Sequence, residues 1–558
     1  MKHKYNFLSA LVLSALTLTS CDLDTSSKTE LNTETAYSNA EACDMALVGC
    51  YDGWQRTVSD EGIGMYLTSE FASEQAFAGL GSSDARNFSV IDEFNTGLAP
   101  SFNDLYNTDW KNYYKAIFRC NQLIKQANSV TNWDGDEKAK NRILGEARTL
   151  RAILYFDLTR LFGDVPLTTE PTEETLPRSA AKDVYQVIFD DLKFAAGNIP
   201  ADAYPADSRN SNDGRITCYA ADALLARAYL YYTGYYGEEH PACSKTEAVS
   251  ALEKVVSSGN YALEKRYKDL WMASSDVLSE TNGDTYAWEL SYAGKWYDGS
   301  AWRSGQGNLS SEIVLNLKFN TTSDYNGNSD GNTFAVYLGP SNRCATNVHI
   351  ASGWAACPVT PYFVKQYRDD PRFSACVWGC QESGFEPDTT NTYEYTGYYT
   401  RKYAPMCMAD GTRQEVAFQL GEKYMTLTNY QDYTVMRYAD VLLMLAELTG
   451  NKEYLNQVRR RAGLPDEEYT VENLRRERAI EFAFEGIHYW DIMRYEKDGA
   501  YAARVLAEAQ NGADVLNGGT AAKTTFTQSN FTQKKGLMQV PNTQISISGG
   551  AMTQNTGW

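Results

Sequence analysis

The sequence predicts a mainly α-helical fold in which a long loop-rich segment with short strands interrupts a scaffold of paired helices. Two observations lead to this prediction. In several long stretches apolar residues recur at alternating spacings of three and four, the pattern of a helix that buries one face. Between about residues 265 and 430 this periodicity stops, and Gly, Asn, Ser, Asp and aromatic residues dominate. Helix pairs joined by short turns suggest a tetratricopeptide-like array, although no repeat of about 34 residues is visible.

The composition argues against several other classes of protein. The 558 residues are 43% hydrophobic and 13% aromatic, with 40 Gly and only 15 Pro, so the chain is neither collagen-like nor disordered. Its mean hydropathy of −0.46 argues against a polytopic membrane protein. A net charge of −20 disfavours nucleic-acid binding. Only 4 His residues are present, which leaves few His side chains to bind a metal ion or to transfer protons. We therefore expect no cofactor.

The N-terminus has the organisation of a bacterial secretory signal. A positively charged start precedes an apolar run over 7–18 that is too short to span a bilayer. The run ends in Leu18-Thr19-Ser20-Cys21, which resembles a lipobox; an ordinary signal peptide that happens to precede a cysteine is the alternative. We expect residues 1–20 to be removed, Cys21 to be lipidated and residues 21–35 to form a polar tether. The anchored chain would then lie on the outer membrane, exposed at the cell surface.

The helical elements follow from their apolar stripes. Stripes run through residues 106–127, 143–161 and 221–232, and Gly163 followed by Pro166 ends the second of them. Further helices are expected at about 246–257, 434–449, 452–462 and 470–495. Within the loop-rich segment, the alternating run 312–319 is typical of a short strand.

The sequence does not determine which cysteines form disulfide bonds. The chain has 11 Cys, and Cys43 with Cys50, or Cys376 with Cys380, could pair locally in an exported protein. Buried free thiols are the alternative for most of them.

Three sequence blocks together carry a family resemblance. The first runs from Glu146 to Leu167, the second joins Met436–Met444 to Val458–Leu464, and the third runs from Glu477 to Asp491. In this order and spacing, after a lipobox, they resemble the SusD/RagB family of outer-membrane glycan-binding lipoproteins. Shorter matches at 220–231 and 369–372 agree with it. His488 is a departure, because the family often has Arg there.

The resemblance implies a fold, an activity and partners. It implies a SusD-like single domain over 36–558, with a tetratricopeptide-like helical scaffold at about 36–264 and 431–500 and a loop-rich ligand-face insertion at about 265–430. It also implies a protein that is not an enzyme, binds an oligosaccharide or polysaccharide, and delivers it to a SusC-like TonB-dependent transporter in the outer membrane.

The charged residues of these blocks are expected to hold the scaffold together. They lie on segments rich in apolar neighbours, so we expect them to pair across helices and not to catalyse a reaction. They are Arg148, Arg151, Arg437, Glu477, Arg478, Glu481 and Glu485.

Other chemistry finds little support in the sequence. There is no G-x-S-x-G motif, phosphate-binding loop or dinucleotide fingerprint. Asn326, Asn328 and Asp330 resemble the first half of a calcium loop, but the twelfth position is Tyr337 where a bidentate Glu is needed. A turn-rich surface loop is the better interpretation, so we expect no metal.

Aromatic residues in polar surroundings mark the expected glycan site. A sugar ring offers apolar C–H groups and hydroxyls, so its site needs flat aromatic side chains beside hydrogen-bonding groups. The segment 288–302 is the first choice, Trp354 is the second, and the 77–95 loop is the third. The candidates are Trp288, Tyr292, Trp296, Tyr297, Trp302, Trp354, Phe77, Arg86 and Asn95.

Two other functions remain open from the sequence alone. A relative with the same scaffold could capture peptides, and a surface glycoside hydrolase would need a carboxylate pair that the sequence does not single out. The net charge favours a neutral glycan over a polyanionic one unless a local basic patch intervenes.

Overall fold

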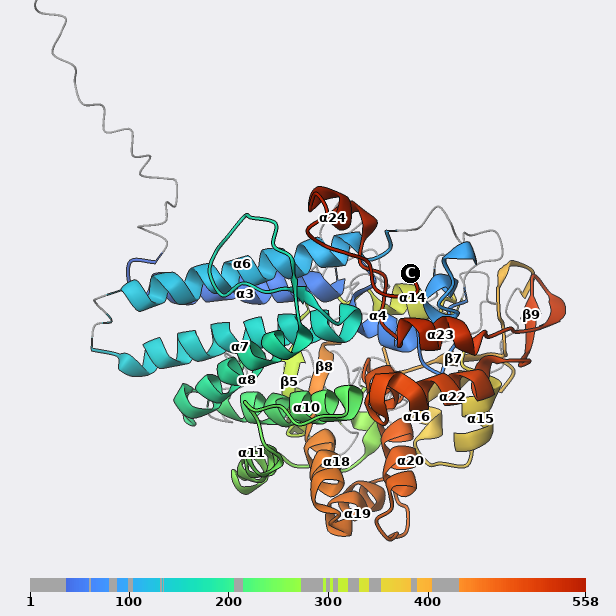
Figure 1. Ribbon diagram of the computed structural model, residues 1–558. Helices are drawn as coiled ribbons and strands as arrows, with labels where there is room; N and C mark the ends of the chain where they lie inside the picture. Colours follow the sequence, from blue (N-terminus) through green and yellow to red (C-terminus); the bar gives the residue numbers. More distant parts are fainter. Residues whose placement is uncertain are drawn as a thin grey trace, which may run out of the picture.

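We describe the fold from a computed structural model of the chain (Figure 1). The structure describes residues 37–59, 62–79, 88–98, 104–130, 133, 135–204, 214–271, 295–297, 302–304, 310–319, 331–340, 353–382, 389–403 and 431–558.

The part of the chain before the loop-rich segment is helical, as predicted. Its helices are α3 (Ala40–Ser59), α4 (Gly64–Phe71), α5 (Ser89–Asp92), η1 (Thr96–Leu98), α6 (Asn107–Ser129), α7 (Glu137–Phe162), α8 (Ala181–Asn198), α10 (Cys218–Tyr236), α11 (Lys245–Ser257) and η4 (Tyr267–Leu270). The long helices α3, α6, α7, α8 and α10 lie side by side, and each packs on the next (Figure 1).

The helix ends follow from capping residues. The Asp136 side chain accepts a hydrogen bond from the Ala139 N–H at 2.9 Å and begins α7. Ser244 and Glu247 form a reciprocal capping box at the start of α11. Gly237 takes a left-handed conformation at the end of α10, where a residue with a side chain would be strained.

Short strands occur both inside and outside the loop-rich segment. The strands are β1 (Val165–Pro166), β2 (Arg178–Ser179), β3 (Lys295–Tyr297), β4 (Trp302–Ser304), β5 (Ile313–Leu317), β6 (Val377–Gly379), β7 (Tyr398–Thr400), β8 (Tyr433–Arg437), β9 (Asp514–Asn517) and β10 (Thr520–Lys523). Each sheet in the described part of the chain has two antiparallel strands: β1-β2, β3-β4, β5-β8, β6-β7 and β9-β10.

The remaining helices complete the body on the C-terminal side. They are α14 (Phe334–Leu338), α15 (Pro361–Tyr367), α16 (Phe373–Cys376), η7 (Thr389–Asn391), α18 (Tyr438–Thr449), α19 (Lys452–Arg461), α20 (Val471–Glu481), α21 (His488–Arg494), η8 (Lys497–Gly499), α22 (Ala500–Gln510), α23 (Gln528–Lys534) and α24 (Asn542–Ile547). Helix α11 packs on α18, and α10 packs on α21, so the two helical parts share one core.

The structure corrects two of the expected helices. The segment expected as a helix from 434 begins with strand β8, because these residues pair with β5, and α18 starts only at Tyr438. The segment 470–495 is two helices, α20 and α21, separated by a turn in which Phe484 and Gly486 have positive φ. The left-handed backbone at these two residues interrupts the helix, and a Cβ atom at Gly486 would lie 2.7 Å from the Tyr66 ring, so only glycine fits there.

The two local disulfides that the sequence left open do not form, and the alternative of buried free thiols holds for the described cysteines. All eight described cysteines are buried free thiols. Cys43 and Cys50 lie two turns apart on α3, a rise of about 10 Å, which is too far for a disulfide. Cys376 and Cys380 flank the extended strand β6, which separates them in the same way.

A buried ion network joins the loop-rich segment to the C-terminal helices. Arg437, at the end of β8, contacts Glu312 at 2.5 Å, Glu481 at 2.8 Å and Glu485 at 2.8 Å. The Lys402 ammonium group also binds Glu485, at 2.6 Å. All five side chains are buried, so each charge depends on its partners for compensation.

Two further arginines extend this network. Arg461 of α19 pairs with Glu312 and Glu481, and Arg372 pairs with Glu477 and Glu481. Burial alone would raise the pKa of Glu481, but the guanidinium groups of Arg461, Arg437 and Arg372 outweigh it and hold this pKa well below its usual range.

The other charged residues of the sequence blocks are paired as well. Arg478 binds Asp440 at 2.7 Å and Asp491 at 2.8 Å. On α7, Arg151 and Arg148 both reach Asp191 of α8, at 2.7 and 3.3 Å. The prediction that these charges serve pairing is confirmed, although Arg437 ends a strand where a helix was expected.

Replacing Arg437 by Met tests how much the buried ion network contributes to the stability of the fold. The change leaves Glu312, Glu481 and Glu485 without this buried partner, so we expect a loss of about 3–5 kcal/mol in the free energy of unfolding. Arg460→Met is the matched control, because Arg460 forms ion pairs with Glu453 and Asp466 on the exposed side of α19 and its side chain is 47% exposed. The control should lose far less stability in urea unfolding, because its ion pairs are exposed to solvent. Equal small losses in the two variants would contradict the role given to the network.

Glu70 gives a prediction about pH. Burial raises the pKa of this α4 carboxyl to about 8, and the negative charge of Glu485 acts in the same direction. The hydrogen bond from the Gly486 N–H at 2.8 Å and the charges of His488 and Lys402 oppose this rise but do not outweigh it. The folded chain therefore keeps Glu70 protonated at pH values where the unfolded chain ionises it. This requirement costs stability progressively as pH rises from about 4.5 to about 8.

Glu70→Gln removes that cost and keeps an oxygen for Gly486. We expect the variant to gain stability relative to the unmodified chain by up to a few kcal/mol between pH 5 and pH 8. Urea unfolding at the two pH values measures the difference. A difference that does not change with pH would show that Glu70 is not held protonated.

Candidate functional site

Trp354 is the outstanding surface feature among the expected ligand residues. Its side chain is 48% exposed, the highest value for a tryptophan among the side chains that the structure describes. Large exposed aromatic groups on an otherwise well-packed protein mark contact surfaces.

The backbone around Trp354 is firmly held. The N–H of Ala355 donates to the Gly339 carbonyl and that of Ala356 to the Tyr337 carbonyl, both at 2.8 Å. Ala355 has φ of +57°, an unfavourable conformation for a residue with a side chain. Its own side chain lies in a small buried cluster with Trp378, Cys380 and Tyr399. Trp354 is thus presented outward from a rigid turn.

A chain of aromatic contacts connects Trp354 to the core. Its ring meets Tyr337 of α14 edge to face at 5.1 Å between centroids. Tyr337 lies 6.0 Å from Phe88, and Phe88 stacks on Phe71 at 4.8 Å. We call Trp354 and the half-buried Tyr337 the Trp354 face. Sequence reasoning named Tyr337 only as an unsuitable calcium ligand and missed this role, for which the sequence carries no local signal.

The 77–95 loop reaches the same region, but not as expected. The Phe77 N–H donates to the Pro358 carbonyl at 2.9 Å, which ties this segment to the residues that follow Trp354. The Phe77 side chain is only 1% exposed, so it belongs to the interior and is not a surface platform for a ligand. Asn95 is half-buried, and its side-chain oxygen accepts the Gly97 N–H at 3.0 Å in a tight turn.

The first-choice segment is described only in part. Its backbone forms the β3–β4 hairpin, in which Trp296 pairs with Arg303 and Tyr297 pairs with Trp302. Other predicted residues lie outside the described part of the chain. These are Trp288, Tyr292, Arg86, Cys21, Asn326, Asn328 and Asp330.

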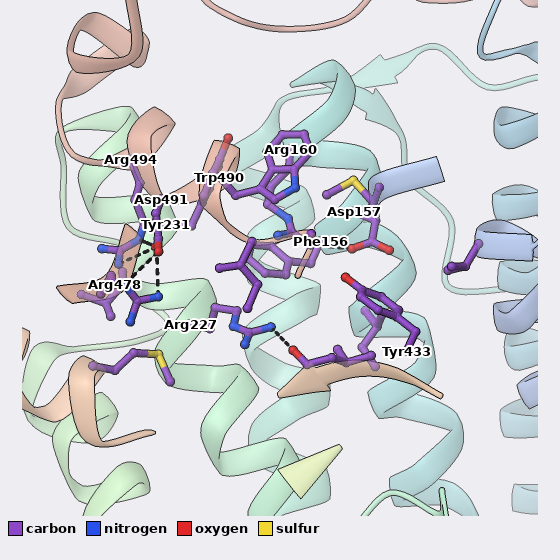
Figure 2. A pocket seen from close by; sticks show the side chains of 18 of the residues that line it. Phe156, Asp157, Arg160, Arg227, Tyr231, Tyr433, Arg478, Trp490, Asp491 and Arg494 are labelled. Carbon is purple, nitrogen blue, oxygen red and sulfur yellow. Dashed lines mark hydrogen bonds and ion pairs between the residues drawn. The ribbon is translucent and has the colours of Figure 1, made fainter. Parts of the chain in front are cut away.

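The interior of the helical body contains a small cavity. It has a volume of about 50 Å³ and lies between α7, α10, β8, α20 and α21 (Figure 2). Arg478 and Asp491 pair across it, and Arg227 donates to the Val435 carbonyl at 2.7 Å. This space holds a few water molecules at most, so it cannot admit a saccharide.

The described residues contain no group of three or more His, Cys, Asp or Glu placed to hold a metal ion. Within the same ranges, no helix has both the length and the apolar character needed to cross a membrane.

Family models match both ends of the chain. A model described as "SusD family" matches residues 369–558, and one described as "Starch-binding associating with outer membrane" matches residues 23–230. Two SusD-like proteins of Formosa agariphila resemble most of the chain. One is 22% identical and the alignment covers 89% of this chain and 92% of the relative; the other is 26% identical, with 88% and 90% covered.

Solved structures share the fold over nearly the whole chain. A "Laminarin binding SusD-like protein" matches with a TM-score of 0.70 and 24% identity, covering 94% of this chain and 100% of the other. Surface glycan-binding protein A from Bacteroides thetaiotaomicron, in complex with laminarihexaose, matches with a TM-score of 0.69 and 21% identity, covering 93% and 99%.

Proposed function

We propose that this chain, which belongs to the SusD/RagB family, is a non-catalytic cell-surface protein that captures oligosaccharides. The observation that carries the proposal is the Trp354 face, an exposed aromatic ring on a rigid turn with Tyr337 against its edge. Such a surface suits the apolar face of a sugar ring. Similar structures named for laminarin or solved with laminarihexaose support this ligand class.

The charged residues support binding without catalysis. A glycosidase needs two carboxyl groups about 5 to 10 Å apart at the bound sugar. The carboxylates of the family blocks, Glu477, Glu481 and Glu485, are instead buried and bound by Arg or Lys. They hold the scaffold and are not available to a substrate.

The remaining parts of the proposal concern location and delivery. Residues 1–20 act as a signal peptide, Cys21 carries the lipid anchor and residues 21–35 form the tether to the domain 36–558. The captured sugar passes to a SusC-like TonB-dependent transporter. The matched family description, which names association with the outer membrane, supports this location. Trp296, Tyr297 and Trp302, whose backbones form the β3–β4 hairpin, are included in the proposal as further candidate contacts for the glycan.

A polysaccharide panel tests the ligand class. The mature chain should migrate more slowly in native gels that contain at least one of laminarin, soluble starch, xylan and galactomannan. The full sequence has a net charge of −20, and removal of Lys2 and Lys4 with residues 1–20 makes the mature chain still more negative, so it should prefer these neutral chains to polyanionic alginate. Absence of binding to all four neutral glycans, together with capture of peptides, would favour the peptide-binding alternative.

Trp354→Ala tests the contact residue. If Trp354 stacks on the ligand, its truncation should weaken binding of the glycan found in the panel by about 2 kcal/mol, roughly thirtyfold. Trp354→Phe should keep much of the affinity because it retains a flat ring. The melting temperature should move by only a few degrees, since the side chain is half exposed. Isothermal titration and melting curves give both quantities. Unchanged affinity in Trp354→Ala would exclude Trp354 as the platform.

A further inference from the structure

A groove lies on the helical scaffold, on different elements from those of the Trp354 face. Its volume is about 600 Å³. One wall is α6, the other is the loop between β1 and β2, and Gln544 of α24 with Met552 closes one side. Helices α6 and α24 lie next to each other at the edge of the helical layer (Figure 1).

The α6 wall carries a row of aromatic residues. Trp110, Tyr114 and Phe118 are spaced four residues apart, so successive rings are displaced by about 6 Å along the helix. Trp110 is nearly buried, Tyr114 is half-buried and Phe118 is 37% exposed. The row therefore runs from the floor of the groove to its open edge.

The loop wall is held in place by partly buried hydrogen bonds. The Asn121 side-chain amide donates to the Thr168 and Glu170 carbonyls at 3.1 and 3.3 Å, and the Tyr155 hydroxyl donates to Thr168 at 2.7 Å. The Tyr114 hydroxyl donates to the Pro166 carbonyl at 2.8 Å. The groove is thus preformed, which reduces the entropy that a ligand must overcome on binding.

The charged groups along the groove carry opposite signs on its two walls. Lys111 and Lys115 line the α6 side, and Glu173 and Glu174 line the loop side. These four side chains are exposed and make no ion pair or hydrogen bond with the described residues, whereas neighbouring Glu170 pairs with Lys125. Lys groups only donate hydrogen bonds and carboxylates only accept them.

This arrangement selects a ligand that is neutral and rich in hydroxyls. For a polyanion or a polycation, attraction to one wall is offset by repulsion from the other, so neither gains a net electrostatic advantage over a neutral chain. A hydroxyl both donates and accepts, so one sugar chain can satisfy both walls while its rings stack on the aromatic row.

We propose that this groove is a second binding site for neutral oligosaccharide, with Phe118 as its stacking residue. The inference rests on the proposed glycan-binding function and adds a second contact for the same class of ligand. Two sites on one chain increase the avidity for a long polysaccharide that reaches both.

Phe118→Ala tests the site with laminarin, soluble starch, xylan and galactomannan in affinity gels. For the polysaccharide that the unmodified chain binds, we expect at least about a threefold weaker interaction. Val471→Ala is the matched control, because Val471 is 44% exposed on α20 and does not line the groove. It should bind as the unmodified chain does. A melting curve of each variant confirms that the fold is retained.

A double glutamate variant and the Trp354 variant separate the possible outcomes. Glu173→Gln with Glu174→Gln should also weaken binding, and Phe118→Ala combined with Trp354→Ala should bind more weakly than either alone. If Phe118→Ala and the glutamate variant bind like the unmodified chain while Trp354→Ala fails, the groove is not a sugar site and the proposed function stands. If the unmodified chain binds none of the four glycans, the proposed function and this site both fail.

Discussion

The fold depends on the burial of paired charges where the loop-rich segment meets the C-terminal helices. Arg437 alone contacts carboxylates from Glu312, Glu481 and Glu485. Each of these charges would be costly without its partners, so the segments that carry them must meet in a single arrangement. These ion pairs fix strand β8 and helix α20 relative to parts of the loop-rich segment. The irregular loops are therefore anchored to the helical body.

The residues that hold the fold and those proposed to bind a ligand are chemically distinct. The buried ion network consists of Arg, Lys and Glu, and these charges are satisfied inside the protein. The residues that lead to the proposed ligand face are aromatic: Phe71, Phe88, Tyr337 and Trp354 form a continuous path from the core to solvent. Carboxylates occupied by arginine are unsuited to acid–base catalysis, and an aromatic surface on a rigid support suits reversible sugar binding.

The sequence pattern predicts those elements whose structure depends on residues within the same segment. The stripes on α6, α7 and α10 depend on spacing within one helix, and pairing of the charged blocks follows from their apolar surroundings. Strand β8 and the break at Gly486 depend on distant partners, β5 and Tyr66, so the local pattern indicated one helix in each case. Phe77 was a candidate ligand residue of the 77–95 loop, but its backbone pairs with Pro358 and its side chain lies inside the protein. The exposure of Phe118 could have been predicted from the sequence, because this residue lies off the buried apolar stripe of α6.

The central claim is that a sugar ring rests on the Trp354 face. A crystal structure of the mature chain, with a fragment of the polysaccharide that it binds in solution, tests this most directly. We expect a sugar ring parallel to the Trp354 indole, with Tyr337 unmoved against the edge of that indole. A ligand bound elsewhere, with Trp354 in solvent at full occupancy of the sugar, would contradict the claim.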